Sequence, residues 1–212
     1  MIKAVIFDMD GVMIDSEPLY RDLKIVHLRE FNLELTEEQA NSIAGARFKD
    51  VVRILFPDIG DAKYREITES FTERSMGEIV YEDVLNPFLT SALDFLKNNG
   101  YKIALATSSS KRKVDEFFDH CKVGGYFDVL AYGDLFKRLK PDPEIYRYVT
   151  ASLELPPEQC AAVEDSDQGL EAAYKAGCFV ICKRERRFGH SQTMAHAWID
   201  DLNEIRGVLE AH

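Results

Sequence analysis

The stretch AVIFDMDG, residues 4–11, decides the fold of this chain. Its first four residues form an unbroken apolar run, which indicates a strand buried on both faces, as in a parallel sheet. Two acids and a glycine follow the run at once. Because open α/β sheets bind their ligands beyond the carboxyl ends of the strands, the residues after each such run are where function is expected.

Further apolar runs alternate with helical patterns along the chain. The expected strands after the first are residues 103–106, 129–131, 161–163, 179–182 and, at an edge, 198–199. Apolar residues spaced as on one face of a helix mark residues 89–96, 114–121, 146–153 and 170–174. Regular alternation of strand and helix predicts an α/β fold with a doubly wound parallel sheet.

One region interrupts this alternation. Residues 16–85 contain helical periodicity and no strand-like run. Crossover helices usually come singly between strands, so a block of helices predicts a separate helical cap inserted after the first strand. We therefore expect a discontinuous core of residues 1–15 and 86–212 and a cap of residues 16–85. The alternative is that these helices simply cover one face of the sheet.

Composition excludes several classes of protein. The 212 residues are 46% apolar and 30% charged, as in a folded globular protein, and the formal charge is −11. A negative chain disfavours nucleic-acid binding, so an anionic ligand needs local positive charge or a metal. No apolar run is long enough to span a bilayer, and the first run is too short for a secretory signal. We expect a cytoplasmic protein without a membrane partner, and a monomer by default.

The four cysteines predict buried thiols rather than a metal or disulfide framework. They stand at positions 121, 160, 178 and 182, and none forms a C-x-x-C pair. Cys178 and Cys182 have the same parity within an apolar stretch, so both side chains are expected on one face of a strand.

Acidic side chains follow two of the expected strands. Asp8 and Asp10 leave the first strand, and Glu164 and Asp165 leave the strand at 161–163. Several carboxylates at one sheet edge repel one another unless a cation lies among them, and Mg²⁺ is the hard cation that prefers such oxygen ligands. The pattern D-x-D alone is more typical of a solvated turn. Joined to the second acidic pair, it favours a magnesium site.

Hydroxyl groups and one lysine supply the complementary half of this site. Thr107 and Ser108 follow the strand at 103–106, and backbone amides opening the next helix near Ser110 can bind an anion. Ser110 by itself indicates only a helix cap. Lys140 precedes a proline, which favours extended backbone and lets the ammonium reach the ligand. A loop lysine is ordinarily a solvated charge, but the Lys-Pro-Asp-Pro turn fixes this one.

Metal, carboxylates, hydroxyls and a lysine together make a site for phosphoryl transfer. One carboxylate can attack phosphorus and form an acyl phosphate, which water later hydrolyses. A second carboxyl group can protonate the leaving oxygen and then deprotonate the water. The residues alone do not distinguish Asp8 from Asp10 in these roles.

The ordered motifs resemble the haloacid dehalogenase superfamily of phosphohydrolases. They are FDMDGV at residues 7–12 with Asp15-Ser16, Thr107-Ser108, Lys140-Pro141 and Glu164-Asp165-Ser166, and together they span the chain. The branch that the chain resembles contains phosphatases and β-phosphoglucomutases with a helical cap after the first strand.

The resemblance assigns a role to each candidate residue. It implies that Asp8 is the nucleophile that becomes aspartyl-phosphate and that Asp10 is the general acid and base. It also implies that Mg²⁺ is held by Asp8, Asp165 and the backbone carbonyl of Asp10, with Glu164 close by. Thr107, Ser108 and Lys140 are then expected to bind the phosphoryl group.

The expected activity is hydrolysis of a small phosphorylated metabolite, with a sugar phosphate as one possibility. Dehalogenation is disfavoured because dehalogenases lack the second aspartate, which is Asp10 here. A sugar phosphomutase shares every core motif, but Phe48 stands where the mutase pattern has an arginine. Arg47, Gly45 and Glu17 are the cap residues expected to contact the substrate. A non-catalytic interaction protein is the remaining alternative, and it does not explain the complete set of competent side chains.

Overall fold

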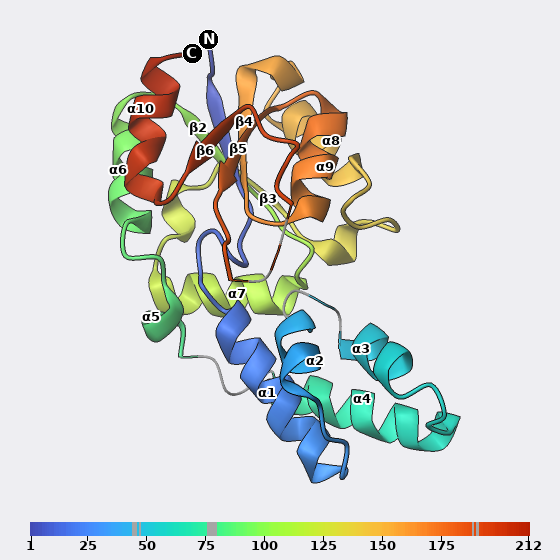
Figure 1. The fold of residues 1–212 in the computed structure, drawn as a ribbon. Helices are drawn as coiled ribbons and strands as arrows, with labels where there is room; N and C mark the ends of the chain where they lie inside the picture. Colours follow the sequence, from blue (N-terminus) through green and yellow to red (C-terminus); the bar gives the residue numbers. More distant parts are fainter. Residues whose placement is uncertain (44–45, 47, 76–79, 188, 190) are drawn as a thin grey trace. The chain divides into compact units, whose positions relative to one another are not determined.

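The computed structural model describes residues 1–212 except 44, 45, 47, 76–79, 188 and 190 (Figure 1). The chain divides into two compact units. The sheet unit comprises Met1–Asp15 and Tyr81–His212, and the helical unit comprises Ser16–Val80. In the structure the second boundary follows Val80, whereas the sequence predicted it after Leu85. Tyr81 belongs to the sheet unit because its ring packs edge-on against Phe117, with ring centroids 5.8 Å apart.

Six parallel strands form the sheet of the sheet unit, in the order β3-β2-β1-β4-β5-β6. Their bounds are β1 Ala4–Phe7, β2 Lys102–Ala106, β3 Val129–Ala131, β4 Cys160–Glu164, β5 Phe179–Lys183 and β6 Ala197–Ile199. All six expected strands are present, with ends that differ by no more than one residue. The α/β fold with a doubly wound parallel sheet is confirmed.

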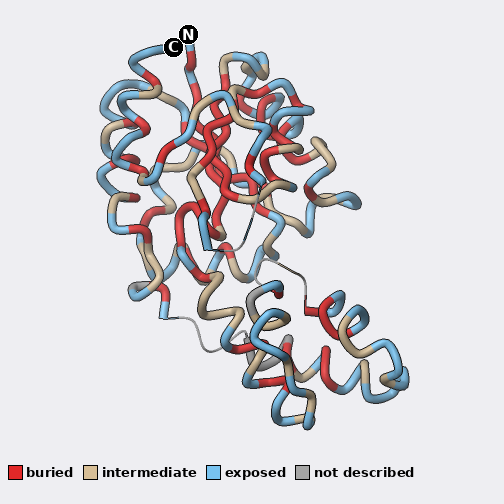
Figure 2. Tube along the Cα trace, viewed as in Figure 1, coloured by how far each residue is buried: buried red, intermediate tan, exposed pale blue. Residues whose placement is uncertain are grey.

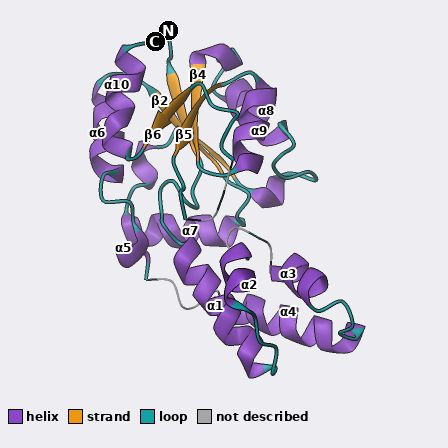
Figure 3. Cartoon of the chain, in the orientation of Figure 1, coloured by secondary structure: helices purple, strands orange, loops and turns teal. Residues whose placement is uncertain are grey.

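Helices cover both faces of this sheet (Figure 1). The sheet unit contains α5 Tyr81–Val84, α6 Leu89–Asn98, α7 Lys111–Cys121, α8 Glu144–Ser152, α9 Asp167–Ala176 and α10 Ile205–Glu210. It also contains short 3-10 turns at Gly124–Tyr126, Gly133–Leu135, Pro157–Gln159 and Leu202–Glu204. Helices α6 and α10 pack together on one face, while α8 and α9 cover the other. Figure 3 separates these helices from the strands by colour.

The strands carry the core of the sheet unit, as the buried residues in Figure 2 show. Each residue of β1 is fully buried. Cys178 and Cys182 belong to one buried cluster together with Cys160, so the predicted shared face of the first two is confirmed. Burial raises the pKa of the thiol to about 11 in Cys160 and to about 12 in Cys178 and Cys182, which keeps these cysteines in the unreactive thiol form.

The helical unit has a core of its own. Its helices are α1 Glu17–Glu30, α2 Glu37–Ser42, α3 Phe48–Leu55 and α4 Asp61–Ser75. Among the residues of this unit whose burial is described, the core consists of Leu23, Leu28, Ile43, Phe48, Val51, Val52, Ile67 and Phe71. His27 is buried among the rings of Phe31, Phe48 and Phe71. Within the described residues, no helix is both long enough and apolar enough to cross a membrane.

The order of strands determines where a ligand can bind. The chain runs from β1 outward to β2 and β3, and then crosses to β4 on the other side of β1. The crevice at such a reversal, beyond the carboxyl ends of the two diverging strands, is where doubly wound sheets bind their ligands. Here the reversal lies between β1 and β4, and β2 is the neighbour of β1 on the other side. The residues that follow these three strands therefore face one site.

Candidate active site

Asp8 follows β1 directly and lies at the centre of this edge. In the parallel register Phe7 pairs with Leu105 of β2 and with Val163 of β4. The Asp8 amide continues the ladder by donating to the carbonyl of Val163 at 3.0 Å. Asp8 is 8% exposed, so its carboxylate is held at the sheet edge within the protein rather than in bulk water.

Lys140 brings its ammonium to Asp8 from the turn before α8. The Nζ atom lies 2.6 Å from Oδ1 of Asp8 and 2.5 Å from Oε1 of Glu164, and it donates to the carbonyl of Ala106 at 2.8 Å. Lys140 is 6% exposed. Three acceptors thus satisfy all three donors of a buried ammonium group.

These buried charges shift one another's protonation. Burial raises the pKa of Asp8 to about 7, with the negative charges of Glu164 and Asp10 adding to the rise and Lys140 opposing it. Burial works against the charged form of Lys140, but the carboxylates of Asp8 and Glu164 outweigh it and raise the pKa of Lys140 above its ordinary value. Lys140 is therefore a permanent cation at this edge, whereas Asp8 is sensitive to added charge.

Asp8, Glu164 and Asp165 form a buried acid cluster. One carboxylate oxygen from each lies within 4.8 Å of the others. Oε2 of Glu164 is buried and has no hydrogen-bond partner among the described residues. These are hard oxygen donors at the spacing of a cation site, so the residues present fit Mg²⁺. The sequence analysis expected Glu164 close to the metal but not among its direct ligands, whereas the structure groups its carboxylate with those of Asp8 and Asp165.

Two glycines make room for this cluster. A Cβ atom on Gly11, which has φ of +82°, would overlap the carboxylate of Asp165. A Cβ atom on Gly169, in the first turn of α9, would overlap the carboxylate of Glu164. Both carboxylates therefore lie against bare backbone, where no other amino acid fits without displacing them.

The carboxylate of Asp10 lies outside the acid cluster. Its Oδ2 accepts from Oγ of Ser109 at 2.7 Å, and its Oδ1 lies 2.6 Å from Nζ of Lys113 on α7. The side chain is 23% exposed. Asp8 and Asp10, two residues apart in the chain, thus have different surroundings: one is buried beside Lys140 and the other is partly open to solvent. A role for the Asp10 carbonyl as a metal ligand stays a prediction.

The hydroxyl residues that follow β2 lie at the same edge. Thr107 is buried, and its Oγ1 accepts from the amide of Ser109 at 3.1 Å. Ser108 is exposed. The side chain of Ser110 accepts from the amide of Lys113 and caps α7, as predicted. Thr107 and Ser108 are thus one and two residues beyond the end of β2, the strand that pairs with β1 up to the residue before Asp8.

The structure does not test the three cap residues that the sequence predicts to contact the substrate. Glu17 begins α1 and belongs to the helical unit. Gly45 and Arg47 lie outside the described residues. Contacts of these residues with a substrate stay predictions.

Several contacts of the site could not be found by sequence reasoning. Tyr146, expected only as part of an apolar stripe, donates its hydroxyl to Oε1 of Glu164 at 2.5 Å. Gln192 donates its side-chain amide to the carbonyl of Asp165 at 2.5 Å. Lys113 follows the quoted Thr-Ser motif by five residues and reaches Asp10. Nothing in the local sequence around Gln192 signals its contact, because the loop that carries it is irregular.

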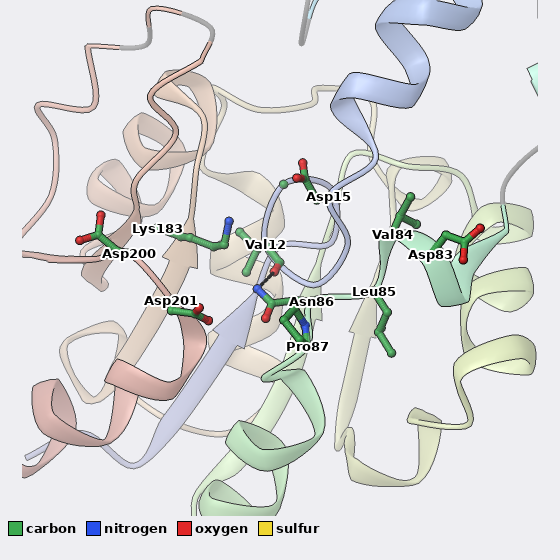
Figure 4. Close-up of a pocket in the computed structure, with 11 residues that line it drawn as sticks. Val12, Asp15, Asp83, Val84, Leu85, Asn86, Pro87, Lys183, Asp200 and Asp201 are labelled. Atoms are coloured by element: carbon green, nitrogen blue, oxygen red, sulfur yellow. Dashed lines mark hydrogen bonds between the residues drawn. The ribbon is translucent and has the colours of Figure 1, made fainter.

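A pocket of about 350 Å³ lies within the sheet unit (Figure 4). Its wall includes the loop that follows Asp10, the segment Asp83–Pro87, and Lys183, Asp200 and Asp201. The side-chain Nδ2 of Asn86 donates to the carbonyl of Val12 across this wall at 3.2 Å. The pocket shares the loop of residues 11–15 with the site, but none of the three clustered acids lines it.

Known proteins are similar to this chain in sequence and in fold. The model of the family described as "Haloacid dehalogenase-like hydrolase" matches residues 5–183. A "Phosphorylated carbohydrates phosphatase" of Thermotoga maritima is 36% identical over 214 residues, which cover 99% of this chain and 91% of the relative. The crystal structure of a beta-phosphoglucomutase candidate from Thermotoga maritima superposes with a TM-score of 0.78 at 32% identity and covers 99% of both chains. CbbY from Rhodobacter sphaeroides, solved in complex with phosphate, gives a TM-score of 0.77 at 27% identity over 97% of this chain and 96% of its own.

Proposed function

This chain belongs to the haloacid dehalogenase-like hydrolase family, and from that premise we propose that it hydrolyses small phosphorylated metabolites, sugar phosphates among them, through an aspartyl-phosphate on Asp8. Its relatives include a phosphorylated carbohydrates phosphatase and a hexitol phosphatase, which support a phosphoric monoester hydrolase activity for this chain. The observation that carries the finer proposal is the buried contact of Asp8 with Lys140 beside two further carboxylates.

In the first half of the proposed reaction, a carboxylate oxygen of Asp8 attacks phosphorus. The new bond joins that oxygen to phosphorus while the bond from phosphorus to the leaving oxygen breaks. The leaving oxygen takes a proton from Asp10. Lys140 contributes a fixed positive charge beside the attacking carboxylate, which reduces its repulsion from the phosphoryl oxygens.

In the second half, water replaces Asp8. Asp10, now a carboxylate, takes a proton from a water molecule whose oxygen attacks phosphorus. The bond between phosphorus and Asp8 breaks, and inorganic phosphate leaves. The different surroundings of the two aspartates support this division of roles, because Asp10 is partly open to solvent, from which the water and the substrate arrive. Thr107 and Ser108, with the amides beyond them, are proposed to bind the phosphoryl oxygens.

The proposal includes a magnesium ion. Asp8, Asp165 and the backbone carbonyl of Asp10 would hold it, with Glu164 beside them or among them, and the bound ion would neutralise charge on the phosphoryl group. A dication also favours the ionised form of Asp8, which the attack on phosphorus requires.

Initial rates on a panel of sugar phosphates and p-nitrophenyl phosphate test the proposed function. We expect phosphate release with Mg²⁺, little with a chelator, and none from Asp8→Asn. Equal rates of hydrolysis with Mg²⁺ and with chelator would refute the role of the metal. A near-normal rate in Asp8→Asn would refute Asp8 as the nucleophile. Alanine at Arg47 should lower kcat/KM for sugar phosphates only, which tests the cap contact.

A phosphomutase is the second candidate, because a solved relative is described as a beta-phosphoglucomutase candidate. β-Glucose 1-phosphate with a glucose 1,6-bisphosphate primer separates the two activities. Inorganic phosphate as the product supports the hydrolase, and glucose 6-phosphate supports the mutase. A monomeric state and a cytoplasmic location stay predictions from the sequence.

A further inference from the structure

Tyr146 connects the core of the sheet unit to the acid cluster. It lies on α8 and is fully buried. Its hydroxyl donates to Oε1 of Glu164 at 2.5 Å. The same oxygen accepts from Lys140, and the Lys140 ammonium lies 5.3 Å from the centre of the Tyr146 ring. One side chain therefore touches both partners of the buried ion pair at the site.

Tyr146 could be an ordinary core residue whose hydroxyl simply needs an acceptor, since buried tyrosines usually find one. The identity of the acceptor argues for more. Glu164 is 0% exposed and contributes one of the three clustered carboxylates. Burial, with Glu164 next to it, raises the pKa of Tyr146 well above its ordinary value, so the phenol stays a donor. A phenylalanine would fill the same volume and make no such contact.

The contacts of Glu164 show what the hydroxyl does. Oε1 receives two hydrogen bonds, from Tyr146 and from Lys140. Oε2 receives none from the described residues, and the carboxylate lies against the backbone of Gly169. The two donors thus hold Oε1 in place, while Oε2 keeps its lone pairs for a ligand of a different kind.

We propose that Tyr146 is a positioning residue, whose hydroxyl fixes the Glu164 carboxylate so that the acid cluster can bind a divalent cation and Lys140 stays against Asp8. The inference rests on the proposed function. Partners that orient the groups around a metal are worth about ten- to a hundredfold in metal affinity. Tyr146 acts through Glu164 and contacts neither the substrate nor the reacting atoms.

Tyr146→Phe tests this inference, because it keeps the ring over Lys140 and removes only the hydroxyl. The primary measurement is Mg²⁺ affinity by calorimetry in the absence of substrate. We expect about tenfold weaker Mg²⁺ binding, with an unchanged circular dichroism spectrum. Tyr148→Phe is the matched control: Tyr148 lies on the same helix, is 45% exposed, and contacts the ring of Phe136. Its Mg²⁺ affinity should equal that of the wild type.

A double-mutant cycle with Glu164→Gln separates positioning from packing. If Tyr146 acts through Glu164, Tyr146→Phe lowers the Mg²⁺ affinity about tenfold in the wild-type background. In the Glu164→Gln background the same substitution lowers it less than about twofold. Wild-type affinity in Tyr146→Phe, or an equal loss in both backgrounds, overturns the inference. A wild type that neither binds Mg²⁺ nor hydrolyses phosphomonoesters overturns the proposed function and the inference with it. An active, Mg²⁺-binding wild type with an unaffected Tyr146→Phe overturns the inference alone.

Discussion

Replacing Asp8 with asparagine should change how the stability of the metal-free protein depends on pH. Burial raises the pKa of Asp8 from 3.8 to about 7 in the folded protein. Between these two values the folded protein holds a proton on Asp8 that the unfolded chain has released. The contribution of Asp8 to the free energy of unfolding therefore falls as pH rises from about 4 to about 7, and the full cost is present above about 7.

The size of this effect follows from the shift. About three pH units at roughly 1.4 kcal/mol each set an upper limit of about 4 kcal/mol. Roughly two of those units lie above pH 5, so about 3 kcal/mol develops between pH 5 and pH 8. Asparagine has nearly the same shape and does not titrate, and Lys140 keeps its acceptors on Glu164 and Ala106. Asp8→Asn should therefore lack this pH dependence.

Urea unfolding in chelator at several values between pH 5 and pH 8 measures the difference. The fluorescence of Trp198, the single tryptophan of the chain, follows the sheet unit, because Trp198 lies in β6. We expect the stability advantage of Asp8→Asn over the wild type to widen by up to about 3 kcal/mol from pH 5 to pH 8. Mg²⁺ should narrow the gap at pH 8 by stabilising the wild type. Parallel stability curves for the two proteins would refute the reasoning.

Three further predictions test other parts of the structure. Gly169→Ala places a Cβ against the Glu164 carboxylate, so it should lower the free energy of unfolding by about 2 kcal/mol and weaken Mg²⁺ binding in calorimetry. Gly207→Ala is the control, because the new Cβ has open space around it, and it should not destabilise the protein. Arg187 is 45% exposed and forms ion pairs with Asp15, at 2.8 Å, and with Glu185. Arg187→Met should therefore lower the free energy of unfolding, measured in urea, by about 1 kcal/mol. A loss of stability that high salt does not change would contradict a contribution from these ion pairs. Iodoacetamide should leave Cys160, Cys178 and Cys182 unmodified in the native protein, as mass spectrometry can check, and should modify them after unfolding, because burial raises the pKa of each thiol.

The sheet was predictable because its strands are short apolar runs with buried side chains on both faces. Such runs are nearly continuous in sequence, and the strand ends agree to within one residue. The convergence of Asp8, Lys140 and Asp165 was predictable for a related reason: in a parallel sheet the carboxyl ends of neighbouring strands meet at one edge. Register then determines which side chains are adjacent, as the pairing of Phe7 with Leu105 and Val163 shows.

Predictions from apolar periodicity were wrong where polar side chains are buried or apolar ones are not. On α1, the apolar side chain of Val26 is 43% exposed, whereas Lys24 and His27 are buried. Lys24 donates to the carbonyls of Ile43 and Ala46, so backbone from a segment distant in sequence satisfies a charge that periodicity assigns to solvent. Such satisfaction depends on tertiary contacts, which a stripe of residue types does not reveal.

Helix ends showed the same limit. The pair Asp142-Pro143 has the pattern of a helix cap followed by a first-turn proline, but α8 begins at Glu144 and Pro143 is the capping residue. Oδ1 of Asp142 nevertheless accepts from the amide of Glu144 at 3.0 Å. Tyr174, expected on the buried stripe of α9, is 54% exposed and stacks on His196. The remaining contacts of the site, from Tyr146 and Gln192, join segments far apart in sequence and carry no motif.

Trapping the covalent intermediate tests the central proposal most directly. Asp10→Asn, mixed with p-nitrophenyl phosphate and Mg²⁺ and quenched in acid within a turnover, should accumulate phosphoenzyme, because this leaving group needs no proton and the hydrolysis of the intermediate is slowed. Borohydride reduces an acyl phosphate to an alcohol and releases the phosphate, so peptide mass spectrometry should find homoserine at position 8 and thereby locate the phosphorylated carboxylate. A phosphoryl group on another residue, or the same label in the Asp8→Asn, Asp10→Asn double variant, would contradict the proposal.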